Sequence, residues 1–444
     1  MKVAFLTLGC KVNSYETEKM KQKFEESGHM VVSFEEAADV YIINTCTVTN
    51  IADRKSRKML HRAKRLNPGS IVVATGCYVD SAKKKGEKDE SVDLFISNSM
   101  KDDLVNIVVD EYCKNNDTTV ENNPELPKIS EAAMKEEHTR AYIKVQNGCN
   151  QYCTYCIIPY VRGPLTSKSV EDVVNEVTEL AKGGLKEIVI TGIHLSSYGV
   201  DSNKSGSFLT LEGKPLLELL EAVSCIDGIE RIRLGSLEPR IITEKFTERL
   251  SKIKGICPHF HLSLQSGCDT VLKRMNRHYT ADEYLEGVGI LRKYFENPAV
   301  TTDIIVGFPG ETDDEFKTTC EFAHKVGFAQ IHVFKYSRRQ GTIADTMEGQ
   351  IAESVKSERS EKLIGIEKEL EEQFQRDSLK EDECVLFEEI NVIEGKKYIT
   401  GYNERYVRIA VSADGFADAE SMCNTIQHVR IVGQLNKEIV LGSC

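Results

Sequence analysis

Three apolar, β-branched segments in the first 80 residues each end at a cysteine, and this pattern constrains the fold of the 444-residue chain more than any other feature. The segments run from Val3 to Cys10, from Tyr41 to Cys46 and from Ile71 to Cys77. Helix-like segments between them predict a parallel sheet, and open α/β sheets place their ligands at the carboxyl edge. We therefore expect an N-terminal open parallel α/β sheet in which three thiols meet at one point.

A second group of cysteines lies within one short segment. Cys149, Cys153 and Cys156 have the spacing C-x3-C-x2-C. Thiolates are the ligands that iron–sulfur clusters and zinc prefer. Zinc sites more often combine two C-x2-C pairs, and the sequence has no second pair of this kind. The spacing favours a four-iron cluster with one iron left open, while a zinc knuckle and three unrelated thiols remain alternatives.

The other cysteines have a simpler interpretation. A buried cysteine behaves as a small apolar residue, so any one of the strand-end thiols alone would be interpreted as core. Three at equivalent strand ends favour a shared ligand instead. The eight remaining cysteines have no metal-ligand spacing and are interpreted as core or surface thiols: Cys113, Cys225, Cys257, Cys268, Cys320, Cys384, Cys423 and Cys444.

Composition limits the class of protein. Hydrophobic residues make up 41% and charged residues 28% of the chain, as in ordinary globular proteins. There is no apolar run of membrane-spanning length and no secretory cleavage site after Met1, so we expect a cytoplasmic protein without a membrane partner. The net charge of −12 argues against bulk attraction to nucleic acid. A local basic segment, Arg54–Arg65, lies on a predicted helix over 50–66 and could contact phosphates or solvent.

Periodicity predicts three domains and a linker: residues 1–114, a polar linker 115–138, residues 139–376 and residues 377–444. In the first, Asn13 with Glu16 predicts the N-terminus of a helix that runs to about Ser27. From Ala141, six strand–helix repeats predict a partial (β/α)6 barrel, shorter than an eight-unit barrel. Its expected strands are 141–146, 187–191, 231–235, 259–264, 300–307 and 330–334.

The last 65 or so residues predict a different structure. Short β-branched runs at 383–393, 397–402, 406–411 and 425–434 favour a small antiparallel β-barrel, a fold that often binds RNA. Residues 378–444 contain 7 basic and 11 acidic side chains, which does not favour a strong RNA anchor. Binding would then depend on a few cations: Lys396, Lys397, Arg405, Arg408 and Arg430.

The segment Gly148–Gly163 resembles the cluster loop of the radical S-adenosylmethionine methylthiotransferases. The resemblance continues through Leu234–Arg240, His261–Gly267 and Thr302–Thr312 and covers nearly the whole chain, including a C-terminal barrel similar to the TRAM domain. It implies an enzyme with a radical S-adenosylmethionine barrel and two 4Fe-4S clusters. Cys149, Cys153 and Cys156 would hold the cluster that binds S-adenosylmethionine, and Cys10, Cys46 and Cys77 the auxiliary cluster that carries sulfur.

The resemblance also suggests cofactor-pocket residues. Tyr155 occupies the aromatic position that lies against the adenine in this family, and we expect Ser236, Gln265, Ser266 and Asp303 in the same pocket. Thr191–Leu195 stands where many relatives have Gly-Gly-Glu, but the glutamate is missing, so the amine of the cofactor needs another contact. No catalytic side chain is assigned beyond the cluster ligands.

The residues around the first cysteine indicate the substrate. Lys11-Val12 after Cys10 resembles the branch that converts N6-threonylcarbamoyladenosine at position 37 of tRNA to its 2-methylthio derivative. Isopentenyladenosine in tRNA and ribosomal protein S12 are the alternative substrates, and a non-enzymatic iron–sulfur RNA-binding protein or a zinc protein the alternatives of another class. The implied partners are tRNA and an electron donor of the flavodoxin or ferredoxin type.

Overall fold

The computed structural model describes residues 1–86, 89–115, 139–200, 211–379 and 381–444. The chain forms two compact units that do not follow chain order. Unit 1 comprises Met1–Lys135, Asn147–Pro164 and Ser337–Thr346; unit 2 comprises Glu136–Gln146, Leu165–Tyr336 and Met347–Cys444. The predicted linker 115–138 lies, except for its first residue, outside the described residues. The predicted domain boundaries stay predictions.

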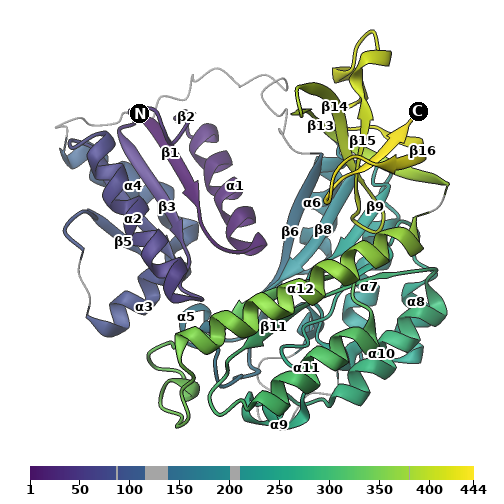
Figure 1. The fold of residues 1–444 in the computed structure, drawn as a ribbon. Coiled ribbons are helices and arrows are strands. Elements are labelled where there is room, and N and C mark those ends of the chain that lie inside the picture. Colours follow the sequence, from purple (N-terminus) through teal and green to yellow (C-terminus); the bar gives the residue numbers. More distant parts are fainter. Residues whose placement is uncertain (87–88, 116–138, 201–210, 380) are drawn as a thin grey trace. The chain divides into compact units, whose positions relative to one another are not determined.

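Unit 1 is built on a five-stranded parallel sheet in the order β2-β1-β3-β4-β5 (Figure 1). Every residue of the two central strands β3 and β4 is buried, as their continuous apolar sequences require. This confirms the predicted open parallel sheet. The strands are β1 (Lys2–Thr7), β2 (Met30–Val32), β3 (Val40–Thr45), β4 (Ile71–Gly76) and β5 (Leu94–Ile96).

Helices cover both faces of this sheet. The side chains of α2 and α3 share one apolar core with the sheet, and those of α1 and α4 share another. The basic helix predicted over 50–66 is α2. The helices are α1 (Lys11–Glu26), α2 (Asn50–Leu66), α3 (Cys77–Lys85) and α4 (Leu104–Asn115).

The predicted role of Asn13 at the start of a helix is wrong. Helix α1 begins at Lys11 with Cys10 as its N-cap, so Asn13 lies inside the first turn. Its buried amide donates hydrogen bonds to the carbonyl oxygens of Leu8 at 2.7 Å and Thr45 at 3.1 Å. The polar side chain therefore satisfies backbone carbonyl groups beside the ends of two neighbouring strands, where water is excluded.

Unit 2 contains the expected partial barrel. Strands β6, β8 and β9 form one parallel set and β10, β11 and β12 another, and a parallel bridge between Leu237 and Leu262 joins the two. A short strand, β7 (Thr166–Ser167), extends the first set at its edge. The six strands are β6 (Arg140–Asn147), β8 (Glu187–Gly192), β9 (Arg231–Leu234), β10 (His259–His261), β11 (Ala299–Val306) and β12 (Gln330–Lys335).

Local sequence signals fix the helices of this barrel. Thr280 and Thr312 each form a capping box with the glutamate three residues on. Ser169 caps α6 by accepting a hydrogen bond from the backbone N–H of Asp172 at 3.1 Å. The helices are α6 (Val170–Lys182), α7 (Lys214–Ser224), α8 (Glu244–Leu250), α9 (Asp269–Arg274), α10 (Ala281–Tyr294) and α11 (Asp313–Val326).

The C-terminal part of unit 2 is a closed five-stranded barrel that follows helix α12 (Glu353–Ser378). Four of its strands were predicted, and the fifth, Val440–Ser443, was not. That fifth strand pairs in parallel with β15, so the barrel is antiparallel at every pairing except this one. The strands are β13 (Asp382–Ile393), β14 (Lys396–Asn403), β15 (Arg408–Ser412), β16 (Ile426–Gln434) and β17 (Val440–Ser443).

Buried arginines join the closed barrel to the starts of the α/β strands. The Arg231 guanidinium donates hydrogen bonds to the carbonyl oxygens of Cys384 at 2.8 Å and Tyr402 at 2.9 Å. The Arg233 guanidinium donates a hydrogen bond to the carboxylate of Glu187 at 2.9 Å. Burial alone would raise the pKa of Glu187, but Arg233 lowers it overall. These contacts lie at the amino ends of β8 and β9, so the closed barrel does not occupy the carboxyl ends of these two strands. Among the described residues no helix has the length and apolar character of a membrane span.

Candidate functional site

The three strand-end cysteines come together as predicted. Strands β1, β3 and β4 are parallel neighbours, and Cys10, Cys46 and Cys77 follow their carboxyl ends. Cys46 and Cys77 are buried and Cys10 is exposed. Burial, together with the nearby Cys77 and Cys10, raises the pKa of the Cys46 thiol to about 11. A nearby cation would favour the thiolate form of Cys46.

Glycine makes this close approach possible. Gly9 has φ +110°, and a Cβ atom there would lie 2.8 Å from the Cβ of Cys46. Gly76 has φ +96°, and a Cβ atom there would lie 2.4 Å from the carbonyl oxygen of Thr45. Both positions exclude any residue with a side chain, so the glycine before Cys10 and the glycine before Cys77 bring these cysteines to the Cys46 strand.

The second triplet lies on a tight loop between β6 and α5 (Ile158–Arg162). The backbone N–H of Cys156 donates to the carbonyl oxygen of Cys153 at 2.9 Å, which closes a turn between them. At the foot of the loop, a Cβ atom on Gly148 would lie 2.0 Å from the carbonyl oxygen of Pro164. Tyr152 is held at φ +50° with half of its side chain exposed. The loop is thus pinched at its base and strained between its cysteines.

The two cysteine triplets belong to the same compact unit. Cys77 packs against Ile157 and Val161 in a small buried cluster. Ile157 directly follows Cys156, so the second triplet is adjacent in sequence to a side chain that contacts the first. Both cysteine triplets therefore lie within unit 1.

A segment from the far end of the α/β repeats holds this arrangement together. Arg339, which is almost fully buried, pairs with Asp53 of α2 at 2.7 Å. Five residues on, the backbone N–H of Ala344 donates to the carbonyl oxygen of Thr154, between Cys153 and Cys156, at 2.8 Å. Segment 337–346 therefore connects the cysteine loop to the helix that follows Cys46.

A buried cation stands beside the thiols. Arg162 donates to Glu16 at 2.9 Å and to Asn13, and Lys101 also pairs with Glu16. Burial opposes the charge on Arg162, but Cys77 and Glu16 outweigh burial and raise the pKa of the guanidinium. The sequence indicates Asn13 and Glu16 only as helix-start residues and does not identify Arg162 or Lys101, which meet Glu16 from distant parts of the chain through packing.

The spacing of the sulfur atoms bears on which group they can hold. One tetrahedral zinc ion would keep its sulfur ligands about 3.8 Å apart, since Zn–S bonds are about 2.3 Å long. Within the described ranges, the only three such ligand atoms within 4.8 Å of one another belong to His261, Asp303 and His332, so neither cysteine triplet is gathered around a single ion. A four-iron cluster fits better, because each thiolate then binds a different iron.

The residues expected in the cofactor pocket are divided between the units. Tyr155 is half-buried in unit 1, and the other four lie in unit 2. Gln265 is buried at φ +71°, and its backbone N–H donates to the carbonyl oxygen of Asp303 at 2.8 Å. Ser266 is fully buried against Thr319 of α11, with 3.2 Å between the hydroxyl oxygens, whereas Ser236 is exposed. Their assignment to the pocket stays a prediction.

Two histidines accompany Asp303 on neighbouring strands. Nε2 of His261 lies 3.4 Å from the Asp303 carboxylate, and the rings of His261 and His332 stack at 5.9 Å. Asp303 and His332 are register partners on β11 and β12, so they project from the same face of the sheet. The sequence analysis singled out only Asp303, although alternation along the strands could have identified the histidines.

His194, in the segment Thr191–Leu195 that lacks the glutamate, is uncharged at neutral pH. Burial, together with the charges of Arg277 and Arg240, lowers its pKa to about 3. Its Nδ1 atom lies 2.6 Å from the hydroxyl oxygen of Ser197, and its backbone N–H donates to Gln146 at 2.7 Å. His194 is thus part of the scaffold below the strand end.

His194 makes stability depend on pH. Its ordinary pKa of 6.5 applies when the chain is unfolded and about 3 when it is folded, so the unfolded chain binds the proton first. Stability falls as pH drops below 6.5, by about 2 kcal/mol at pH 5. We expect urea unfolding at pH 7 and pH 5 to show this loss of unfolding free energy. In His194→Asn, the unfolding free energy should decrease between these two pH values by about 2 kcal/mol less than in the parent. An equal loss in both proteins would contradict it.

Comparison with known proteins places these features in a family. Residues 143–323 match the radical SAM superfamily, and residues 2–97 match the uncharacterized protein family UPF0004. The chain is 39% identical over 444 residues to the threonylcarbamoyladenosine tRNA methylthiotransferase MtaB of Bacillus subtilis, covering 97% of this chain and 93% of that protein. A protein of the same name from Aquifex aeolicus is 39% identical over 415 residues, 92% of this chain and 98% of that protein.

The chain is also similar to proteins whose names give another substrate, dimethylallyladenosine in tRNA. A tRNA-2-methylthio-N(6)-dimethylallyladenosine synthase of Moorella thermoacetica is 32% identical over 395 residues, 87% of this chain and 86% of that protein. The radical S-adenosylmethionine methyltransferase TsrM from Kitasatospora setae shares the fold, with a TM-score of 0.52 and 15% identity over 77% of this chain and 76% of that one. The nearly full-length similarity confirms the expected enzyme over a non-enzymatic protein: the chain belongs to the radical SAM tRNA methylthiotransferase family.

Proposed function

We propose that this enzyme converts N6-threonylcarbamoyladenosine at position 37 of tRNA to its 2-methylthio derivative. The observation that carries the proposal is the 39% identity over nearly the whole chain to two proteins named for this substrate, against 32% to the dimethylallyladenosine synthase of Moorella thermoacetica. Lys11-Val12 after the first cysteine supports the same choice. We also propose a cytoplasmic location, which a tRNA substrate supports.

Two 4Fe-4S clusters and S-adenosylmethionine supply the one-electron, sulfur and methyl chemistry that an unactivated aromatic C–H bond requires. We assign the loop triplet (Cys149, Cys153, Cys156) to the cluster that binds S-adenosylmethionine and the strand-end triplet (Cys10, Cys46, Cys77) to the auxiliary cluster. Tyr155, Ser236, Gln265, Ser266 and Asp303 are proposed to line the cofactor pocket.

The protein itself contributes position and charge. Packing of Ile157 on Cys77 keeps the two triplets in one unit. Arg162 places a permanent positive charge beside the strand-end thiolates, which favours their ionised, metal-binding form. The exposed Cys10 leaves one edge of this triplet open to solvent, as a site that must admit a base requires. The electron donor is proposed to be a flavodoxin or ferredoxin.

Nucleoside analysis tests the proposal. Total tRNA from cells that lack the gene should contain no 2-methylthio-N6-threonylcarbamoyladenosine by mass spectrometry, because the proposed enzyme inserts this sulfur. The modification should return with the intact gene and not with one that encodes Cys46→Ala. If that nucleoside is unchanged in the deletion strain while 2-methylthio-isopentenyladenosine is lost, the substrate assignment is wrong and the chemistry stands.

A further inference from the structure

The strongest concentration of positive charge in unit 1 lies on helix α2. Arg54, Lys58 and Arg65 are exposed and follow the spacing i, i+4, i+11, which places them on one face of the helix. His61 lies on the same face but contacts Asp89 at 3.0 Å. Among the residues that the structure describes, Arg54, Lys58 and Arg65 have no ion-pair partner. The protein has a net charge of −12. Three unpaired cations on one helix face are therefore a distinct positively charged surface that can attract anions.

The row of cations also has a linear geometry. With a rise of about 1.5 Å per residue, Arg54 and Lys58 lie about 6 Å apart along the helix axis, and Lys58 and Arg65 about 10 Å apart. These two distances are of the same order as the separation of neighbouring phosphates along a nucleic-acid strand. A compact acidic group would need the cations to converge on one point, and a straight helix face does not do that.

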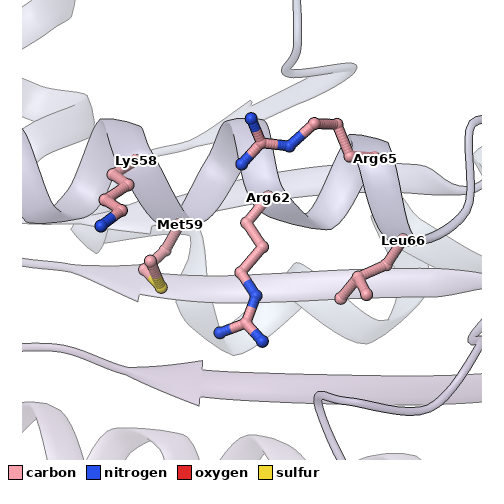
Figure 2. Close-up of a pocket in the computed structure, with 5 residues that line it drawn as sticks. All are labelled: Lys58, Met59, Arg62, Arg65 and Leu66. Carbon is pink, nitrogen blue, oxygen red and sulfur yellow. The ribbon is translucent and has the colours of Figure 1, made fainter.

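Apolar side chains lie beside the cations. Figure 2 shows Lys58, Arg62 and Arg65 projecting from α2 together with Met59 and Leu66, and these five residues line a pocket of about 450 Å³. Arg62 also pairs with Glu35. A surface that combines cations with apolar side chains suits a nucleotide, whose phosphate is anionic and whose base has an apolar face.

The opposite face of α2 is fixed to the strand-end cysteines. Ser56 is fully buried, and its hydroxyl group donates to the carbonyl oxygen of Cys46 at 3.0 Å and accepts from the Cys46 backbone N–H at 3.3 Å. The cation row therefore lies about one helix diameter, 10–12 Å, from Cys46. A strand that runs along α2 would have its neighbouring nucleotides within reach of the site that supplies sulfur.

We infer that the outer face of α2 (Arg54, Lys58 and Arg65) binds the phosphate backbone of tRNA next to the target adenosine. The inference rests on the proposed function in taking tRNA as the ligand. It assigns the positioning of the RNA to unit 1, where the cysteines are, and not to the closed barrel alone. The contact is with phosphates and carries no base sequence information.

Charge reversal tests the surface in the full-length enzyme. The variant Arg54→Glu/Lys58→Glu/Arg65→Glu should bind an unmodified tRNA transcript at least about 30-fold more weakly at 0.15 M salt, as measured by fluorescence anisotropy. The slope of log affinity against log salt should decrease by about two to three, since up to three phosphate contacts are lost. Because the three cations have no partners, the melting temperature should stay unchanged.

A matched variant controls for overall charge. Lys245→Glu/Lys254→Glu/Lys273→Glu changes three exposed lysines of unit 2 that have no ion pair within the described residues, and gives the same net charge of −18, since three reversals add −6 to −12. It should weaken tRNA binding by less than about threefold, with an unchanged salt slope. An equal loss in both variants would overturn the inference, because the effect would then come from total charge.

Two further outcomes separate the inference from the function. If the α2 variant binds tRNA like the parent but is reduced more slowly by a flavodoxin, the surface binds an acidic protein and the inference is overturned, while the proposed function stands. If the parent enzyme itself does not bind tRNA, the proposed function fails and the inference fails with it.

Discussion

Cys153→Ala is expected to abolish the reductive cleavage of S-adenosylmethionine. In the proposed assignment Cys153 is the middle ligand of the loop triplet, and its carbonyl oxygen closes the turn to Cys156. Loss of one of three thiolates removes the site that binds the cofactor to iron. The amount of 5′-deoxyadenosine formed with dithionite, measured by liquid chromatography, should fall at least about 10³-fold, equivalent to about 4 kcal/mol.

Cys46→Ala should have a different effect. This cysteine lies on the side of the strand-end triplet that contacts Gly9 and Ser56, whereas Cys77 is the member that packs on Ile157. The variant should therefore still form 5′-deoxyadenosine at a rate within about threefold of the parent, and no methylthiolated nucleoside. Cys320→Ala, a change of a buried cysteine in unit 2, should preserve both activities. Loss of cleavage in Cys46→Ala would show that the two sites are not independent.

Arg162→Ala is expected to destabilise the protein by about 3 kcal/mol. Arg162 and Glu16 are 1% and 8% exposed, so removal of the arginine leaves a buried carboxylate with one of its two cationic partners. Breaking such a pair typically costs about 3–5 kcal/mol, and the remaining contact with Lys101 favours the lower end. Urea unfolding at pH 7 measures the change.

Two controls separate burial from charge. Arg162→Lys keeps the charge but loses the planar fork that reaches both Glu16 and Asn13, so we expect a smaller loss. Arg249→Ala breaks an exposed pair with Glu221, two contacts at 2.6 Å, and should cost less than about 1 kcal/mol. If Arg162→Ala costs no more than Arg249→Ala, the buried network does not stabilise unit 1 in the way described.

The thiol sites were predictable because their signals are local. A run of buried β-branched residues that ends at a cysteine specifies both a strand and the position of its thiol, and parallel pairing then brings Cys10, Cys46 and Cys77 to one edge. The six strands of the partial barrel have the same kind of signal. Their observed bounds lie within one residue of the predicted ones, except that the strand expected over 259–264 already ends at His261.

The partners of these sites were not predictable in the same way. Arg162 meets Glu16 across 146 positions and Arg339 meets Thr47 across 292 positions, and no periodicity in the sequence marks such contacts. Asn13 is a residue type that often caps helices. Its amide instead donates hydrogen bonds to the strand-end carbonyl groups, because these groups are buried and need a donor. Strands β5 and β17, of three and four residues, are too short to show alternation.

The closed barrel also changes one expectation about RNA. Arg405, one of five cations considered for binding, is buried in a pair with Glu383 and therefore cannot contact phosphate as predicted. Arg408 and Arg430 pair with Glu389 and Glu381. A sequence shows how many cations a barrel has, but only the fold shows which of them are already neutralised.

Iron content of the purified, anaerobically reconstituted protein tests the two-site account most directly. The parent should contain about eight iron atoms per chain, since two four-iron clusters are bound. Cys10→Ala/Cys46→Ala/Cys77→Ala and Cys149→Ala/Cys153→Ala/Cys156→Ala should each contain about four, with the electron paramagnetic resonance signal of the cluster that remains. Retention of all iron by either variant, or loss of all iron by both, would contradict two separate three-cysteine sites.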